Sequence, residues 1–270
     1  MQTLSLEFMT VLGLSPPDIV SVASDVGYNT VSICLTPSPV LGDKVQPLVG
    51  NRGLVEQTAQ RVRETGVRMS LGEGFVIAPE ATLESFREPI DIATELGARC
   101  INCTIIDPDR KRALDLLSAL ADLAAQSGVE TAAEFSSYSP IISNLALGLA
   151  AINEIGNEHL GLLVDLMHIV RNGNRAADVA NIPRRIIKYA QICDGPLTSP
   201  SHESYRAEAV FDRRMPGEGE FGVREFLSLL PQDVVVGVEV PSKTLEQRGL
   251  TFRERAKYAF DATQAILATM

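Results

Sequence analysis

The chain has 270 residues, of which 45% are hydrophobic, and its 34 acidic and 24 basic side chains give a formal net charge of −10 at neutral pH. This charge argues against binding to a nucleic-acid backbone, which requires a basic footprint, and against a cationic membrane-surface patch. The length suits one α/β barrel of about 250 residues, whose core folds without disulfide or metal support.

Targeting signals and disulfides are not evident in the sequence. Glu7 interrupts an N-terminal apolar run that lacks a basic start, and no apolar run reaches the ~18–20 residues of a membrane span. The four cysteines are too few and scattered for a disulfide scaffold. Cys100 and Cys103 fall in one expected strand, where residues three apart point to opposite faces. We therefore expect a cytoplasmic protein with no membrane partner and with structural thiols.

Short β-branched and apolar runs alternate with segments of helical periodicity along the chain. The expected strands are 4–8, 30–35, 67–71, 100–106, 130–135, 160–165, 186–193 and 234–240. The expected helices include 54–65, 83–96, 112–126, 221–230 and 252–270. Gly66, Gly97 and Gly128 stand where helices should end, which predicts a left-handed backbone at each of them.

This alternation predicts a parallel sheet covered by helices. Eight strands and a final helix favour a closed (β/α)8 TIM barrel, a single domain over residues 1–270, and an open doubly wound sheet is the alternative. The connection 194–220 is rich in Pro, Ser, Gly and charged residues, and it is too long for an ordinary turn. Long connections of this kind usually carry function or disorder.

The last four expected strands each carry an oxygen-bearing side chain at or near their ends, namely Glu134, Asp165, Gln191 and Glu239. In a barrel the active site lies at the carboxyl ends of the strands, and neighbouring strands are only ~4.8 Å apart. These side chains should therefore converge, and the repulsion among the three carboxylates would be relieved by a divalent cation. We predict that the four residues bind a metal, although a single carboxylate at such a position can also cap a helix or face solvent.

The type of metal follows from the donors in this set, which are oxygens and an amide without imidazole or thiolate. Hard cations such as Mn²⁺ or Mg²⁺ prefer oxygen, whereas zinc usually takes His or Cys. Four protein ligands leave two octahedral positions for adjacent oxygens of a hydroxy-carbonyl substrate, whose neighbouring proton then becomes easier to remove. Glu73, after the third strand, and Asn102, on the fourth, are expected to line the mouth as substrate contacts; exposure to solvent is the alternative for Glu73.

These residues resemble the xylose isomerase-like TIM barrel family, in particular its ketose 3-epimerases and inosose dehydratases. The resemblance covers nearly the whole chain and rests on Ala-Ala-Glu134-Phe, Val-Asp165-Leu-Met-His168, Ala-Gln191-Ile-Cys-Asp194, Arg214-Met-Pro-Gly-Glu and Val-Glu239-Val.

The resemblance implies roles for individual residues. Glu134 and Glu239 would bind metal and also act as an acid/base pair, whereas Asp165 would be a ligand only. His168 and Arg214 would contact substrate oxygens; a packed histidine and an exposed loop arginine are the alternatives. The family resemblance also implies a possible homo-oligomer. Gln191 departs from the pattern, because the epimerases commonly have histidine there, and this weakens the epimerase assignment.

The leading hypothesis is a metal-dependent isomerase or epimerase of a small sugar or polyhydroxylated carbonyl compound. Its glutamates would transfer a proton through a metal-stabilised enediolate. β-Elimination of water shares the first step, so a dehydratase or other lyase of inosose or dehydroshikimate type is the second reading. A barrel that binds a ligand without turning it over is the third, although both candidate acid/base residues are present.

Overall fold

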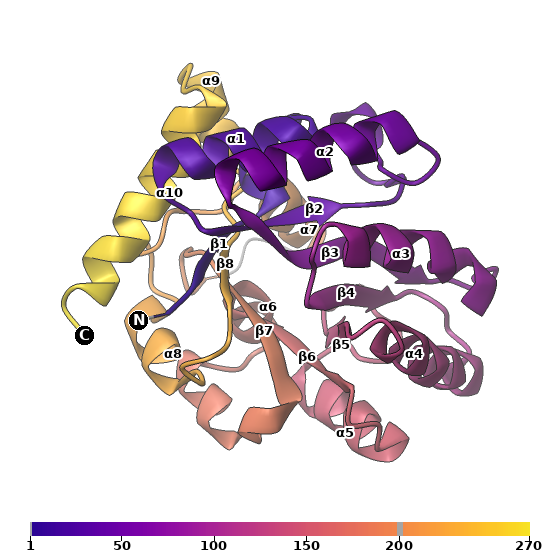
Figure 1. The fold of residues 1–270 in the computed structure, drawn as a ribbon. Helices are drawn as coiled ribbons and strands as arrows, with labels where there is room; N and C mark the ends of the chain where they lie inside the picture. The colour runs from indigo at the N-terminus through magenta and orange to yellow at the C-terminus, as the bar shows by residue number, and fades with distance from the viewer. Residues whose placement is uncertain (1, 199–201) are drawn as a thin grey trace.

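The strands of the protein close into a parallel barrel in the order β1 to β8, as seen in a computed structural model that describes residues 2–198 and 202–270 (Figure 1). They are β1 (Leu4–Leu6), β2 (Thr30–Cys34), β3 (Arg68–Ile77), β4 (Cys100–Ile105), β5 (Glu130–Glu134), β6 (Leu160–Asp165), β7 (Ile187–Ile192) and β8 (Val236–Val238). Closure between β1 and β8 confirms the predicted TIM barrel and shows that the open sheet is wrong.

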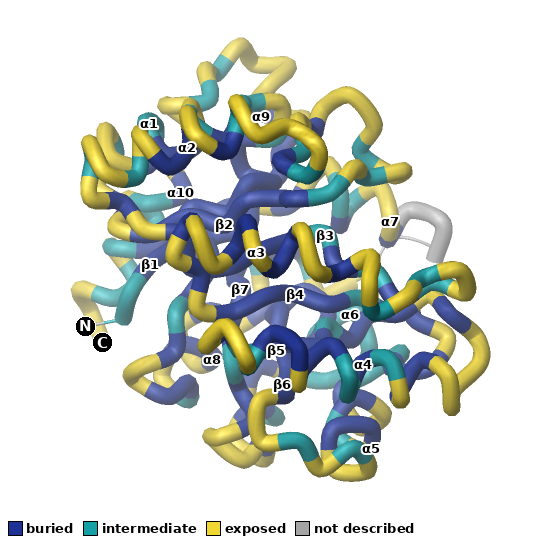
Figure 2. Tube along the Cα trace, turned by 45° about the vertical axis from the view of Figure 1, so that its right-hand side comes forward, coloured by how far each residue is buried: buried dark blue, intermediate teal, exposed yellow. Residues whose placement is uncertain are grey.

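Helices surround the barrel, with buried inner faces and exposed outer faces (Figure 2). They are α1 (Pro16–Val26), α2 (Arg52–Thr65), α3 (Arg87–Glu95), α4 (Arg110–Ala125), α5 (Leu145–Ile155), α6 (Leu166–Arg171), α7 (His202–Phe211), α8 (Val223–Leu229), α9 (Lys243–Gln247) and α10 (Phe252–Leu267). A short 3₁₀ helix, η1 (Phe8–Val11), follows β1. Within the described part of the chain, no helix has both the length and the apolar character that membrane crossing requires.

Local signals set the ends of these helices. The side chain of Asn51 accepts a hydrogen bond from the backbone N–H of Leu54 and so begins α2. Gly66 ends α2 in the left-handed conformation, with a φ of 72°. Gly97 and Gly128 also have positive φ, of 81° and 72°. The predicted left-handed glycines are therefore confirmed at all three positions.

The apolar core has two layers. A small cluster of Leu71, Cys100, Ala132, Leu163 and Tyr189 fills part of the barrel interior, while the larger cluster lies between strands and helices. Cys100 belongs to the inner cluster and Cys103 to the outer one, as expected for residues three apart on a strand. Burial raises the pKa of Cys103 to about 12, so its thiol is not a nucleophile at neutral pH.

Two segments differ from the sequence-based expectation. Strand β3 continues to Ile77, because its register shifts between Gly72 and Phe75 and lets the strand bend without ending. Gly74 has a φ of 98°, and a Cβ there would lie 2.4 Å from Thr36 Oγ1. Glu73 is therefore inside the strand, not after it. The connection 194–220 contains α7, and its residues 199–201 lie outside the described part of the chain.

Candidate active site

The carboxyl end of the barrel brings together the four predicted metal ligands. Glu134 ends β5, Asp165 ends β6, Gln191 lies in β7 and Glu239 follows β8. Asp165 pairs in register with Gln191 of β7. The backbone N–H of Glu239 donates to the carbonyl of Ile192, which also lies in β7. Asp165, Gln191 and Glu239 are buried, while Glu134 is half-buried at the opening.

A buried arginine lies between two of these carboxylates. Arg213 Nη1 is 2.8 Å from Asp165 Oδ2, and its Nη2 is 2.8 Å from Glu239 Oε2. The sequence analysis assigned the site arginine to Arg214, which does not reach this cluster: it is exposed, and its Nη1 lies 3.5 Å from the carbonyl of Glu218.

The opposite orientations of Arg213 and Arg214 have a simple geometric cause. The backbone of Arg214 forms an isolated antiparallel bridge with Asp194, so the segment is extended there. Consecutive side chains of an extended segment point to opposite sides. Only one of two adjacent arginines can therefore face the barrel, and residue type alone does not indicate which.

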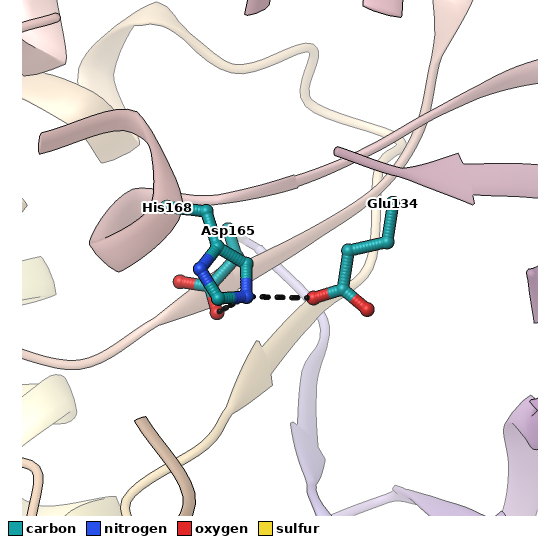
Figure 3. A group of neighbouring side chains, drawn as sticks. All are labelled: Glu134, Asp165 and His168. Carbon is teal, nitrogen blue, oxygen red and sulfur yellow. Dashed lines mark ion pairs between the residues drawn. The ribbon is translucent and has the colours of Figure 1, made fainter. Parts of the chain in front are cut away.

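His168 lies at the opening between two carboxylates (Figure 3). Its Nε2 is 3.3 Å from Glu134 Oε1 and 3.7 Å from Asp165 Oδ2, and ligand atoms of the three residues lie within 4.8 Å of one another. The other ring nitrogen, Nδ1, forms a hydrogen bond with the hydroxyl of Tyr205 on α7. Tyr138 stacks on Tyr205 with ring centroids 5.1 Å apart. Neither tyrosine was predicted from the sequence; the long connection that carries α7 was a signal for Tyr205 alone.

A second acidic group forms the floor of the site. Ligand atoms of Glu7, Glu73 and Glu239 lie within 4.8 Å of one another, and all three residues are buried. Gln191 Nε2 donates to Glu7 Oε2 at 3.1 Å and lies 3.4 Å from both Glu73 Oε1 and Glu239 Oε1. Asn102 Nδ2 donates to Glu73 Oε2 at 2.9 Å. Two side-chain amides thus hold the carboxylates of the floor in place.

Asn102 also connects the floor with the opening, because its Nδ2 donates to Glu134 Oε2 at 2.8 Å. The two residues expected to line the mouth, Glu73 and Asn102, are therefore both in the cluster.

Glu7 on the floor was not assigned a role from the sequence. The hydroxyl of Tyr189 donates to Glu7 Oε1 at 2.7 Å. Gly237 gives the carboxylate its space, since a Cβ at that position would lie 2.3 Å from Glu7 Oε1. Because Glu7 accepts one N–H of Gln191, it helps to orient that amide, as outer-shell carboxylates orient metal ligands.

Burial and crowding divide the carboxylates electrostatically. Burial, followed by repulsion from Glu7 and Glu134, raises the pKa of Glu73 well above its usual value. Burial also raises the pKa of Glu239 well above its usual value, although Arg213 opposes this. Asp165 differs: burial raises its pKa, but Arg213 and His168 outweigh that effect and the net pKa is lowered. Burial thus favours the neutral form of Glu73 and Glu239, whereas the neighbouring Arg213 favours the carboxylate form of Asp165.

The donors present fit a divalent cation. Gln191 Oε1 and Asn102 Oδ1 are buried and accept no hydrogen bond from the described residues. Buried acceptors are rarely left unsatisfied, so an oxygen such as Gln191 Oε1 is free to act as a ligand. The predicted ligands are divided between the two acidic groups, Glu134 and Asp165 with His168, and Glu239 with Glu7 and Glu73. His168 thus offers an imidazole nitrogen that the expected donor set did not contain.

A closed eight-stranded barrel with buried carboxylates at the carboxyl ends of its strands is the arrangement of a TIM-barrel enzyme site. More specifically, residues 20–262 match the family described as xylose isomerase-like TIM barrel, and the chain belongs to that family. This confirms the resemblance drawn from the strand-end motifs. A search of curated protein sequences gave no significant match.

Several solved structures share the fold. A xylose isomerase-like TIM barrel/4-hydroxyphenylpyruvate dioxygenase fusion protein is 17% identical, with a TM-score of 0.81 over 99% of this chain, and the chain spans 43% of that fusion. The IolI protein with a bound zinc atom is 19% identical, with a TM-score of 0.77 over 100% of this chain and 99% of IolI. D-Allulose 3-epimerase from Methylomonas sp. in complex with D-allulose is 16% identical, with a TM-score of 0.72 over 100% of this chain and 97% of the epimerase.

Proposed function

We propose that the protein is a divalent-metal-dependent isomerase or epimerase of a small polyhydroxylated carbonyl compound. The observation that carries this proposal is the acidic cluster at the carboxyl end of the barrel, where Glu134 and Asp165 belong to one group of close side chains and Glu239 to another. The buried Oε1 of Gln191 accepts no hydrogen bond from the described residues. The shared fold with D-allulose 3-epimerase and with zinc-bound IolI supports the same reading.

Glu134, Asp165, Gln191 and Glu239 are the residues that would hold the metal, which we propose to be Mn²⁺ or Mg²⁺. When bound, a divalent ion polarises a substrate carbonyl and makes the neighbouring C–H more acidic. Arg213 places a positive charge beside these ligands: its Nη1 donates to Asp165, its Nη2 lies 2.8 Å from Glu239 Oε2, and its Nε donates to the carbonyl of Ala209. His168 can donate or accept through Nε2 at the opening.

Glu134 and Glu239 would move the proton. They come from β5 and from the end of β8, so they approach a substrate at the barrel mouth from different strands. One carboxylate takes the proton from the carbon next to the carbonyl, and the C–H electron pair moves toward the carbonyl oxygen. The other glutamate, in its acid form, returns a proton to the opposite face, which inverts that carbon.

The test combines metal analysis with a substrate screen. Purified protein should bind Mn²⁺ or Mg²⁺ and convert at least one of a set of ketohexoses and inososes. The same screen includes 3-dehydroshikimate to detect a dehydratase, because dehydration begins with the same proton transfer. Glu239→Gln and Glu134→Gln should each lower turnover by about a hundredfold or more while the fold is retained. The matched control is Glu130→Gln, which should keep full activity. Glu130 lies on the same strand as Glu134 and pairs with Lys188 at 2.9 Å.

Folded wild-type protein that neither binds these ions nor converts any of the compounds would contradict the proposal. That result would favour a barrel that binds a ligand without turning it over.

A further inference from the structure

A second cavity lies beside the barrel mouth and is separate from the acidic site. It has a volume of about 450 Å³ and is bounded by η1, the end of α7, α9 and the first turn of α10. Its apolar lining includes Met9, Leu12 and Phe211, whereas Lys44, Lys243 and Arg255 supply three cationic groups. We call this space, defined by these six residues, the side cavity.

Arg255 is the unusual residue of the side cavity. It is only 5% exposed, yet it forms no ion pair within 4 Å among the described residues, and its Nε has no acceptor there. Buried charges in proteins are nearly always paired, because an unpaired buried charge is costly. Burial lowers the pKa of Arg255, but a guanidinium remains charged at neutral pH. The charge of Glu246 acts on Arg255 from beyond ion-pair distance, so the guanidinium has no close anionic partner among the described residues.

The guanidinium is also held in a fixed orientation. Its central carbon lies 4.7 Å from the centroid of the Phe252 ring, so the aromatic face supports it by a cation–π contact. A guanidinium stacked on a ring keeps its N–H edge free, and that edge matches the two oxygens of a carboxylate or phosphate.

The charge around Arg255 points to the same class of ligand. The chain carries a net charge of −10, yet among the described residues three cations and a single carboxylate, that of Glu246, line the side cavity. The exposed Lys44 lies with its Nζ 5.7 Å from the Phe211 ring centroid, and neither Lys44 nor Lys243 has an ion-pair partner in the described ranges. A local positive field in an acidic protein attracts anions.

We propose that the side cavity binds a small organic anion. Its carboxylate or phosphate group would bind Arg255, assisted by Lys44 and Lys243, and its apolar part would pack against Met9, Leu12 and Phe211. The volume lies within the range of roughly 300–1,000 Å³ typical of small-molecule sites. None of the carboxylates of the acidic site lines this cavity, so the inference stands independently of the proposed reaction.

Calorimetric titration with phenyl phosphate, benzoate, inorganic phosphate and neutral benzyl alcohol tests the proposal. Phenyl phosphate and benzoate should bind, and benzyl alcohol should not. Whichever of the two organic anions binds more tightly identifies the preferred anionic group. Inorganic phosphate should bind more weakly than phenyl phosphate, because it cannot pack against the apolar lining of the side cavity. Arg255→Met should weaken binding by about tenfold or more. The control is Arg253→Met, which should bind the organic anions like wild type. Arg253 lies two positions away on α10 and pairs with Asp25 at 3.4 Å on the surface.

Thermal unfolding without ligand adds an independent readout. Because Arg255→Met removes an unpaired buried charge, the variant should be at least as stable as wild type, whereas loss of a purely structural arginine would lower the midpoint. If Arg255→Met does not fold, Lys243→Met on the surface takes its place and should weaken binding several-fold. The proposal is overturned if wild type binds neither organic anion at millimolar concentration, or if Arg255→Met or its replacement binds like wild type. A change of oligomeric state in Arg255→Met, which would mean that a second copy covers the cavity, also overturns it.

Discussion

Arg213 Nη1 donates to Asp165 Oδ2 at 2.8 Å and its Nη2 lies 2.8 Å from Glu239 Oε2, so a cation already lies between two carboxylates of the proposed metal site. This contact explains how the pKa of a fully buried Asp165 is lowered despite burial. It also means that a metal ion must share these oxygens with the guanidinium. The arginine and the metal therefore compete for the same negative charge.

Replacing Arg213 with methionine should tighten Mn²⁺ binding by about tenfold, because the competing cation is removed while the apolar length of the side chain is kept. Isothermal titration with Mn²⁺ measures this directly, without any substrate. Arg214→Met, next in sequence but exposed, is the control and should bind Mn²⁺ like wild type. Weaker binding in Arg213→Met would show that the arginine organises the ligands instead of competing with the metal.

Gln191 should set which metal the site prefers. Its Oε1 is buried and has no hydrogen-bond partner in residues 2–198 and 202–270, and an amide oxygen is a weak, hard donor. Gln191→His replaces it with imidazole and should shift the preference from Mn²⁺ toward Zn²⁺ by about tenfold or more. Gln191→Leu removes the donor and should weaken binding of both ions. Competition titrations with the two metals measure the ratio, and equal affinities in wild type and Gln191→Leu would exclude Gln191 as a ligand.

Tyr205 should act as a positioning residue for His168. Its hydroxyl bonds to Nδ1, which fixes the tautomer and leaves Nε2 facing Glu134 and Asp165. Tyr205→Phe should lower kcat by about tenfold on the substrate found in the screen, with little change in KM. Tyr138→Phe removes a hydroxyl from the ring stacked on Tyr205 and should leave kcat and KM unchanged. A wild-type kcat in Tyr205→Phe would contradict the role.

Asp107 should make stability depend on acid. Two Arg112 N–H groups bond to this carboxylate at 2.6 Å each, and these bonds lower the pKa of Asp107. A carboxyl group whose pKa is lower in the folded state than in the unfolded state stabilises the fold fully at pH values above the unfolded pKa of about 3.9. This stabilisation is lost as the pH falls through the pKa of the folded state. Asp107→Asn should therefore lower the unfolding midpoint by a few degrees at pH 7, with the difference from wild type vanishing toward pH 2.

Thermal unfolding by circular dichroism across this pH range measures the Asp107 effect. Asp115→Asn, which removes an exposed pair with Lys111, should change the midpoint little at any pH. A difference between Asp107→Asn and wild type that persisted at pH 2 would indicate a cause other than the charge of Asp107.

The barrel itself could be predicted because its signals are local. Strand and helix periodicity, glycine at helix ends and apolar strand interiors act over a few residues, and all of them agree. The positions of Glu134, Asp165, Gln191 and Glu239 followed as well, since the carboxyl ends of parallel barrel strands meet at one end of the barrel. Their roles as ligands and acid/base groups stay a prediction.

Other features depended on contacts between segments that are distant in sequence. The bridge between Asp194 and Arg214 turns Arg213 into the site, the shift of β3 beside Gly74 keeps Glu73 within a strand, and helix α7 carries Tyr205 to His168. The unpaired Arg255 is likewise visible only once α10 packs near η1 and α9. Sequence by itself determined the elements, because hydrogen bonding and apolar spacing are short-range. Only the tertiary structure decided which charged side chains meet, because pairing depends on distances that the chain's own order does not contain.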